Sequence, residues 1–285
     1  MILNFKNWAQ RYGFFIDIDE LFIFLRQNFF HLRVFGIIPA RYASTRFLGK
    51  PLVRLSDFSM VEWVYRRASK AFDTVAVATD DERIANEVLR FGGNVVMTSP
   101  DHLSGTDRCA EALLLIQEEK GIKADVVVNV QGDEPFIDPD LLVRLADCFH
   151  DETTQIATVV KPFEYMNDLL NPNNVKAVMT AAGRAVYFSR STVPYIRGFA
   201  QEDWLNQHIF FWHLGLYAYR ADVLTRLTQL PPSPLEIAES LEQNRWLEND
   251  YYIRIIQTHG DHIAIDTPDD LTRAQQWIEK NSTIQ

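Results

Sequence analysis

The chain has 285 residues, of which 47% are hydrophobic and 23% charged, and its formal net charge is −10. These proportions are those of a globular protein with a sizeable core, and the acidic balance argues against non-specific nucleic-acid binding, which needs a basic face. The two cysteines form no C-x-x-C motif, which fits a reducing cytoplasm, and no apolar run is long enough to predict a membrane span.

Residues 1–32 are unusually dense in aromatic side chains, namely Phe5, Trp8, Tyr12, Phe14, Phe15, Phe22, Phe24, Phe29 and Phe30. Asp17, Asp19 and Glu20 interrupt the apolar run and no small-residue cleavage site follows, so a secretory signal is not predicted. We interpret the segment as an atypical N-terminal appendage, a helix that packs on the domain or on a partner subunit. A membrane-surface helix is the weaker alternative, because its polar face lacks the lysines typical of that role.

From residue 33 onward, strand-like and helix-like segments alternate. The predicted strands of the first half are 34–38, 74–79, 95–97 and 125–131, and the predicted helices are 60–71, 82 to the Gly92-Gly93 pair, 104–119 and 139–150. Thr79 with Glu82, and Ser104 with Asp107, have the spacing of capping boxes. Residues 125–131 are nearly all β-branched, which indicates a parallel strand buried on both faces. This order predicts an α/β fold with a doubly wound, mostly parallel, Rossmann-like sheet.

The second half has a different pattern. Residues 156–161, 175–179, 184–188 and 213–219 are predicted strands with little helix between them, and residues 236–248 and 268–280 are predicted helices on either side of a short strand, 263–265. Such a mixed, partly antiparallel extension suits a lid or a subunit contact.

Three cations, Arg41, Arg46 and Lys50, stand in the loop after the predicted strand 34–38. Backbone N–H groups in such a loop bind phosphate oxygens while lysine and arginine neutralise charge, which predicts a nucleotide site. The loop is not a Walker A motif, because Ser44 and Pro51 occupy positions that need glycine and a hydroxyl residue. No G-x-G-x-x-G fingerprint follows a strand either. The alternative is an ordinary surface loop that carries arginines.

Asp133 follows the predicted strand 125–131 by two residues, after Gly132. Ligands of doubly wound sheets bind outside the carboxyl ends of the strands, where the loop of Lys50 also lies. A carboxylate beside a triphosphate is the usual protein ligand of Mg²⁺, and glycine allows close backbone approach. The alternative is that Asp133 only begins a turn before Pro135.

Asp266 stands just outside a well-specified helix start. Thr267 and Asp270 form a capping box, and Pro268 occupies the first helical position. Because Thr267 already serves as the cap, we favour Asp266 as a second metal ligand that faces Asp133. Local hydrogen bonding to the helix start is the alternative.

Motifs spread over roughly residues 33–280 stand in a fixed order: PARYASTR (39–46), GKPL (49–52), SGT (104–106), VNVQGDEP (128–135), YFSR (187–190), HLG (213–215), LEQ (241–243) and DTP (266–268). In this combination the chain resembles the 3-deoxy-manno-octulosonate (Kdo) cytidylyltransferase family, the CMP-Kdo synthetases. The resemblance implies a domain of the nucleotide-diphospho-sugar transferase type at residues 33–285. Within it, a mixed-sheet dimerisation and lid extension at about 184–252 would bind the sugar.

The same resemblance implies transfer of CMP from CTP to Kdo, with release of pyrophosphate, for lipopolysaccharide biosynthesis. It implies a cytoplasmic homodimer that uses Mg²⁺, with Asp133 and Asp266 as metal ligands and Arg41 and Lys50 on the triphosphate. The other implied nucleotide contacts are Ala40, Ser104, Gly105 and Gln131, and the implied sugar contacts are Arg190, His213, Tyr217, Glu242 and Gln243.

The chemistry of two of these residues can be judged without the resemblance. One other position differs from the usual sequence of the family. The planar guanidinium of Arg190 suits a sugar carboxylate, and the alternative for His213 is a structural strand residue bonded within the fold. Leu48 stands where the family usually has proline. The loss of a fixed φ adds unfolded-state entropy worth about 0.4–1 kcal/mol and predicts a more mobile loop.

The predicted reaction is direct displacement at the α-phosphorus of CTP by the anomeric hydroxyl, and no Ser-His-Asp or Cys-His arrangement is evident. Within this chemistry, 8-amino-Kdo and a sialic acid are alternative acceptors. A glycosyltransferase-like protein is disfavoured because residues 131–135 contain no Asp-x-Asp pair. A non-catalytic CTP-binding module is the third alternative.

Overall fold

The computed structural model describes residues 32–43, 47–260, 264–265 and 270–280. By its contacts the chain divides into two units, Met1–Arg33 and Val34–Gln285, and all the described helices and strands belong to the second. All of the predicted appendage except Leu32, the predicted capping box at Thr267 and the predicted ligand Asp266 lie outside the described residues.

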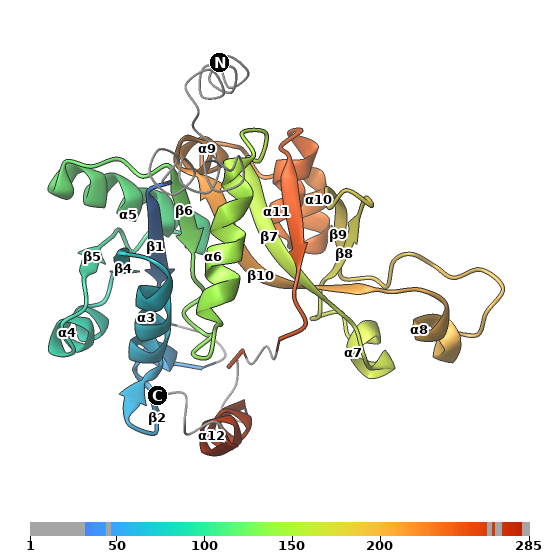
Figure 1. The fold of residues 1–285 in the computed structure, drawn as a ribbon, viewed down its shortest axis with the longest axis horizontal. Helices are drawn as coiled ribbons and strands as arrows, with labels where there is room; N and C mark the ends of the chain where they lie inside the picture. Colours follow the sequence, from blue (N-terminus) through green and yellow to red (C-terminus); the bar gives the residue numbers. More distant parts are fainter. Residues whose placement is uncertain (1–31, 44–46, 261–263, 266–269, 281–285) are drawn as a thin grey trace, which may run out of the picture. The chain divides into compact units, whose positions relative to one another are not determined.

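A nine-stranded sheet forms the centre of the part of the chain that the structure describes (Figure 1). Its strands are β1 (Val34–Pro39), β4 (Thr74–Thr79), β5 (Val95–Met97), β6 (Val126–Asn129), β7 (Ile156–Pro162), β8 (Lys176–Met179), β9 (Ala185–Ser189), β10 (Phe211–Arg220) and β11 (Ile253–Gln257). The main order is β11-β7-β10-β6-β1-β4-β5, and β8 and β9 extend from β10. A separate hairpin pairs β2 (Arg54–Leu55) with β3 (Phe58–Ser59).

The predicted mixture of parallel and antiparallel pairing is confirmed. Strands β6, β1, β4 and β5 run parallel, as do β7 and β11, whereas β10 runs antiparallel to β6, β7 and β8. From β1 the chain moves outward through β4 to β5 and then returns to place β6 on the other side of β1. The order therefore reverses between β1 and β6, and such a switch point is where doubly wound sheets bind ligands.

Helices cover both faces of the sheet. They are α3 (Met60–Ala71), α4 (Glu82–Arg90), α5 (Gly105–Lys120), α6 (Pro139–Asp147), α7 (Met166–Leu170), α8 (Trp204–Gln207), α9 (Ala221–Leu227), α10 (Pro234–Glu239), α11 (Glu242–Glu248) and α12 (Asp270–Lys280), with 3₁₀ turns η1 (Lys50–Leu52), η2 (Cys148–His150) and η3 (Gln201–Asp203). Helices α3 and α6 contact each other, and α5 contacts α9. Within the described ranges, no helix combines the length and the apolar character that crossing a membrane requires.

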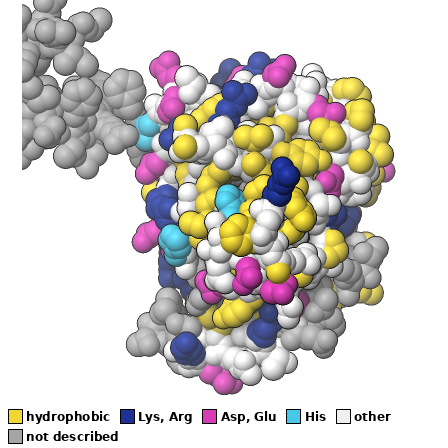
Figure 2. Space-filling model, turned by 90° about the vertical axis from the view of Figure 1, so that its right-hand side faces the viewer, with side chains coloured by type: hydrophobic (Ala, Val, Ile, Leu, Met, Phe, Trp, Pro, Cys, Tyr) yellow, Lys and Arg dark blue, Asp and Glu magenta, His cyan; other side chains and the backbone are white. Residues whose placement is uncertain are grey.

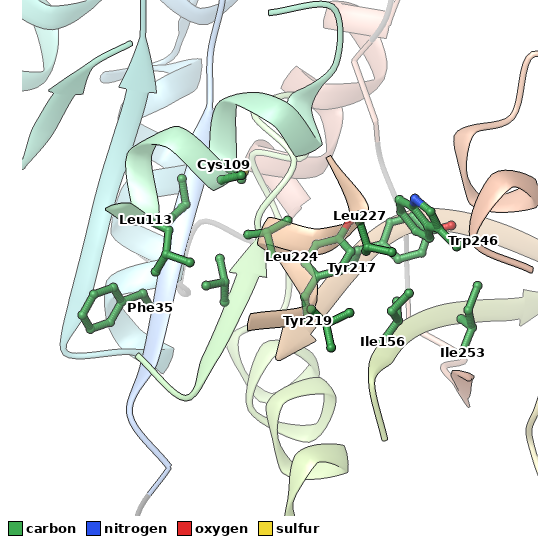
Figure 3. Close-up of a cluster of buried hydrophobic side chains, with 14 of the residues drawn as sticks. Phe35, Cys109, Leu113, Ile156, Tyr217, Tyr219, Leu224, Leu227, Trp246 and Ile253 are labelled. Carbon is green, nitrogen blue, oxygen red and sulfur yellow. The ribbon is translucent and has the colours of Figure 1, made fainter. Parts of the chain in front are cut away.

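The main core lies between the sheet and the α5, α9 and α11 side (Figure 3). Phe35 and Ile37 of β1 point into it, since alternate strand residues share a face. Leu113 from α5, Leu224 from α9 and Trp246 from α11 complete it, and all are almost fully buried. This packing fixes the strand ends that carry the candidate site.

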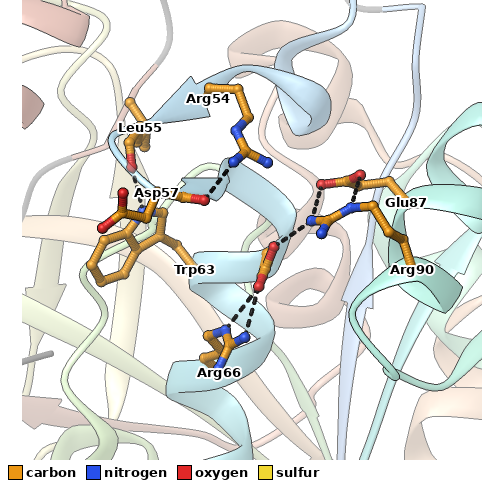
Figure 4. A network of polar contacts seen from close by, with 8 residues as sticks. Arg54, Leu55, Asp57, Trp63, Arg66, Glu87 and Arg90 are labelled. Carbon is orange, nitrogen blue, oxygen red and sulfur yellow. Dashed lines mark hydrogen bonds and ion pairs between the residues drawn. The ribbon is translucent and has the colours of Figure 1, made fainter.

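A buried carboxylate braces α3 against α4 (Figure 4). Glu62 on α3 is 2% exposed and binds Arg66 one turn later and Arg90 at the end of α4. Arg90 also pairs with Glu87. Each oxygen of the Glu62 carboxylate accepts a hydrogen bond from an arginine, so the buried charge is paired. The contact with Arg90 also joins α3 to α4.

The predicted cap of the second helix was wrong. Asp81, not Thr79, is the N-cap of α4, and its side chain accepts from the N–H of Arg83. Thr79 is the last residue of β4, and its hydroxyl accepts from the N–H of Asp81 instead. The predicted cap of α5 at Ser104 is confirmed, since its side chain accepts from the N–H of Asp107.

Three other predicted elements differ from the structure. The predicted helix 236–248 is divided into α10 and α11 at Ser240, which has a left-handed φ of 51°. Helix α6 ends at Asp147 and continues as the 3₁₀ turn η2. Ala264 and Ile265 belong to no strand, whereas β11 was not predicted at all.

Candidate functional site

The loops after β1 and β6 meet at the switch point of the sheet. The N–H of Val130 donates to the carbonyl of Ile37 over 2.9 Å, so pairing continues past the end of β6. Gly132 then passes so close to β1 that a Cβ there would lie 3.1 Å from the carbonyl oxygen of Pro39. The missing side chain allows this approach, which brings the two predicted phosphate and metal loops together as the sequence predicted.

Lys50 and Asp133 form an ion pair at this meeting point. The Lys50 ammonium lies 2.9 Å from Asp133 Oδ2 and donates to the carbonyl oxygen of Ile265 over 2.8 Å. The side chains are 13% and 29% exposed, so the lysine is mostly enclosed and the carboxylate remains accessible. The pair therefore places one cation and one anion side by side at the strand ends.

Ile265 joins a third segment to the same point. Its N–H donates to the backbone carbonyl of Asp133 over 2.9 Å, and its carbonyl accepts from Lys50. Asp266, the next residue in the chain, lies outside the described residues. Its convergence with Asp133 stays a prediction, supported by the position of its neighbour.

The residues around Asp133 fit Mg²⁺. The described residues contain no group of three or more His, Cys, Asp or Glu side chains able to hold a metal by themselves. Mg²⁺ needs only one or two carboxylates, since phosphate oxygens and waters complete its octahedron. The accessible carboxylate of Asp133 is such a ligand. Burial, and then the charge of Asp133, raise the pKa of the neighbouring Glu134 well above its ordinary value, which favours its neutral form.

A glycine with a left-handed backbone shapes the loop that carries Lys50. Gly49 has a φ of 69°, and its N–H donates to the carbonyl of Tyr42 over 2.9 Å. The Tyr42 ring lies close to this glycine, and the guanidinium of Arg83 lies over the same ring, 3.3 Å from its centroid. Leu48 is 67% exposed, and Arg41 is also exposed. Lys50 is thus aimed by a turn that rests on an aromatic ring.

Replacing Gly49 by alanine should lower the free energy of unfolding by more than about 1–2 kcal/mol, which is the cost of a left-handed backbone alone. The new Cβ would also lie 3.1 Å from the Tyr42 ring. Gly121→Ala is a matched control, because Gly121 has a φ of 66° with nothing within 4 Å. Urea denaturation of both variants measures the difference, and equal losses would contradict a role for the Tyr42 contact.

The start of α5 lies against the ends of β1 and β6. Ser104 caps the helix, and a Cβ on Gly105 would lie 3.4 Å from Pro39 Cγ and 3.8 Å from Asn129 Nδ2. Thr106 donates to the carboxylate of Glu242 over 2.7 Å, and Arg245 binds the other oxygen over 3.0 Å. Burial raises the pKa of Glu242, although Thr106 and Arg245 oppose the shift. This contact connects the predicted nucleotide side of the site to its predicted sugar side.

A second connection runs through β10. Gln131 donates to the carbonyl of Gly215 over 3.0 Å, at a bulge in the β10–β7 pairing between His213 and Tyr217. Thr158 donates its only hydroxyl proton to Leu216 O over 2.7 Å and lies 3.0 Å from His213 Nε2. The hydroxyl therefore accepts from His213, which places a proton on Nε2.

Tyr217 carries a buried hydroxyl that makes no hydrogen bond to the residues the structure describes. Burial, and then the charge of Glu242, raise its pKa well above the ordinary value although the neighbouring Thr158 hydroxyl opposes the shift, so the hydroxyl keeps its proton. Its ring lies 5.2 Å from that of His213 and 5.0 Å from that of Trp246. A buried donor without a protein partner is a group that a ligand can satisfy.

Arg190 binds backbone carbonyls from two other segments. Its guanidinium donates to Glu239 O over 2.7 Å, to Pro172 O over 3.2 Å and to Ser240 O over 3.3 Å. Gln243 is 6% exposed at the start of α11, next to Glu242. Glu239 and Lys176 hold the backbone of Arg190, and no motif or periodicity in the sequence marked either of them.

Comparison with known proteins agrees with this geometry. A family model described as cytidylyltransferase matches residues 35–256. Curated 3-deoxy-manno-octulosonate cytidylyltransferases from Parabacteroides distasonis and Bacteroides thetaiotaomicron are 53% and 52% identical to the chain; the alignments cover 87% and 88% of it and 98% and 100% of the relatives.

A solved structure is also similar to this chain. It is described as CMP:2-keto-3-deoxy-manno-octonic acid synthetase complexed with CTP, and it is 36% identical with a TM-score of 0.78 over 87% of this chain and 99% of that one. The doubly wound fold, the strand-end loops and these relatives agree, and the chain belongs to the 3-deoxy-manno-octulosonate cytidylyltransferase family.

Proposed function

We propose that the protein transfers CMP from CTP to Kdo, forming CMP-Kdo and pyrophosphate for lipopolysaccharide biosynthesis. The observation that carries the proposal is the Lys50–Asp133 pair, which stands at the switch point of the sheet in a chain of this family. The relatives are named for this reaction and the solved neighbour is described with CTP.

In the reaction, the anomeric hydroxyl oxygen of the sugar acid attacks the α-phosphorus of CTP. A new P–O bond forms, the bond to the β-phosphate oxygen breaks, and pyrophosphate leaves with the bonding electrons. The hydroxyl proton passes to solvent. Arg41 and Lys50 stabilise the charge that grows on the leaving group, because fixed cations there act more strongly in the transition state than in the ground state.

The remaining nucleotide contacts follow from the same placement. Ala40 is buried where β1 ends, and Ser104 and Gly105 begin α5 beside it. We propose that these three lie against the cytosine and that Gln131 lies near the nucleotide. Asp133 and Asp266 would hold Mg²⁺, which when bound neutralises phosphate charge and lowers the pKa of the attacking hydroxyl.

The sugar contacts lie on the β10, α11 and β9 side. We propose that Arg190 binds the sugar carboxylate, and that His213, Tyr217, Glu242 and Gln243 bind its hydroxyls. The buried hydroxyl of Tyr217 supports this assignment. The Thr106–Glu242 hydrogen bond would transmit the position of the sugar to the start of α5.

A pyrophosphate-release assay with CTP and a panel of sugar acids tests the function. Kdo is expected to give the highest kcat/KM. A higher kcat/KM with 8-amino-Kdo or a sialic acid would assign that acid as the acceptor instead. Absence of CTP-dependent pyrophosphate with every acid would overturn the enzyme assignment and favour a non-catalytic CTP-binding module.

We also propose that the protein is a cytoplasmic homodimer. Figure 2 views the side that carries α8 and shows hydrophobic side chains across its middle. Exposed apolar residues from α7 and the residue before it, from β9, and from the segment between β9 and β10 are Tyr165, Leu170, Val186, Tyr195, Phe199 and Ile209. Patches of this kind mark protein interfaces. Light scattering should give twice the chain mass. We further propose that residues 1–32 form an appendage separate from the cytidylyltransferase domain.

A further inference from the structure

Glu239, the last residue of α10, accepts hydrogen bonds from β9 and from the residue after it. Its carboxylate accepts from Ser189 Oγ over 2.7 Å, from the Tyr187 hydroxyl over 3.2 Å and from the N–H of Arg190 over 2.9 Å. Burial alone would raise its pKa, but these hydrogen bonds lower it below the ordinary value, so the group is a carboxylate. Glu239 thereby fixes the backbone on which Arg190 stands.

The Arg190 side chain is held by the same residue. The carbonyl of Glu239 accepts from Arg190 Nε over 2.7 Å, and the Ser240 and Pro172 carbonyls accept from the two terminal nitrogens. A guanidinium has five N–H donors, and these contacts engage three of them. The planar group is therefore oriented with donors left over for a carboxylate ligand.

Lys176 completes the cluster from β8. It is 1% exposed, and its ammonium donates to Arg190 O over 3.0 Å and to Asn171 O over 2.7 Å. The charged groups that act on it are Arg190 and Glu239, while the ring of Phe163, after β7, lies 5.9 Å away and its β10 register partner is Trp212. Two cations and one anion leave a net charge of +1, which matches one carboxylate.

We propose that Glu239 and Lys176 are positioning residues of the sugar site, which hold Arg190 in the orientation that selects a sugar bearing a carboxylate. This inference rests on the proposed function. Preorganised donors lower the cost of ordering a ligand contact, so the loss of a positioning residue weakens sugar binding and leaves CTP binding intact.

The test compares Glu239→Gln with wild-type full-length protein. The KM for the sugar acid should rise about 10-fold or more, since Gln replaces the charged acceptor by a neutral amide with a single acceptor oxygen, while the KM for CTP changes less than about twofold. Glu87→Gln is the matched control: Glu87 pairs with Arg90 on α4, which contacts β4 and β5 and not β8 or β9, and its replacement should leave both constants unchanged.

The pH profile separates positioning from a general structural effect. Burial, and then the charge of Arg190, lower the pKa of Lys176 to about 8, and Glu239 opposes the shift. Above that pH the site loses its net positive charge, so the KM for the sugar acid should rise. Glu239→Gln removes the opposing carboxylate, so the rise should begin at lower pH.

A second, milder variant keeps the inference testable if Glu239→Gln does not fold. Tyr187→Phe removes one hydrogen bond from Glu239 at a partly exposed position and should raise the sugar KM about two- to fivefold. An unchanged sugar KM, or an equal rise in both KM values with an unshifted pH profile, would overturn the inference while wild-type turnover still supports the function. A wild-type protein inactive with every acid would overturn both.

Discussion

Replacing Asp133 by asparagine should reduce kcat for CMP transfer by at least about 100-fold, the scale of losing one fixed electrostatic contact to the reacting phosphates. Asparagine has the same shape and still offers an oxygen to Lys50, 2.9 Å away. It lacks the negative charge that a magnesium–nucleotide complex requires. The change therefore removes the charge of the site while keeping its geometry.

The fold should tolerate this substitution. Asp133 is 29% exposed, and exposed or partly exposed ion pairs contribute at most about 1 kcal/mol. Thermal unfolding should therefore change little. Asp222→Asn is a suitable control, because Asp222 forms an exposed ion pair with Arg226 on α9, away from the strand ends. Turnover of Asp133→Asn within tenfold of wild type would contradict the proposed metal site.

The strand-end loops could be predicted from sequence because two strong patterns coincide there. Buried strands appear as apolar runs, and the carboxyl ends of parallel strands meet at one edge of the sheet. The cations follow the run 34–38 and the carboxylate follows the run 125–131, and the two runs form neighbouring parallel strands. The side chains were therefore expected to lie close together. Lys50 and Asp133 do so across 83 positions of sequence.

The broken helix could not be predicted, because its cause lies elsewhere in the chain. Residues 236–248 have continuous helical propensity, yet Ser240 adopts a left-handed φ of 51° that serine rarely takes. Arg190, 50 positions earlier, binds the carbonyls freed at Glu239 and Ser240. The contact with Arg190 thus stabilises the break between α10 and α11, and this break lies at the proposed sugar site.

The cap of α4 and the strand β11 were also not predicted correctly, because each depends on pairing within the sheet. Thr79 and Asp81 are both good cap residues, but the carbonyl of Thr79 accepts from Thr98 in the sheet, which leaves the cap to Asp81. Strand β11 is a short run in which Arg254 interrupts the apolar residues, and its pairing with β7 supplies the stability that the pattern lacks.

Replacing Lys50 by methionine should raise the KM for CTP and lower kcat, with a loss in kcat/KM of at least about 100-fold. The ammonium binds two acceptors, Asp133 Oδ2 and Ile265 O, from segments 83 and 215 positions away. Its removal leaves both without their donor, so the free energy of unfolding should fall by about 1–3 kcal/mol, unlike in Asp133→Asn. Enzyme kinetics and urea denaturation measure the two effects.

Arginine should not rescue this position, because a planar fork cannot reproduce a compact ammonium between acceptors at 2.9 Å and 2.8 Å. The double variant Lys50→Met, Asp133→Asn should lose less stability than the sum of the single losses, because Lys50→Met already removes the donor and leaves Asp133→Asn no contact with position 50 to weaken. Strict additivity in urea would mean that the pair does not interact in solution. If Lys50→Arg then retained wild-type kcat/KM, Lys50 would serve only as a diffuse positive charge, and its aim by Gly49 and Tyr42 would have no catalytic purpose.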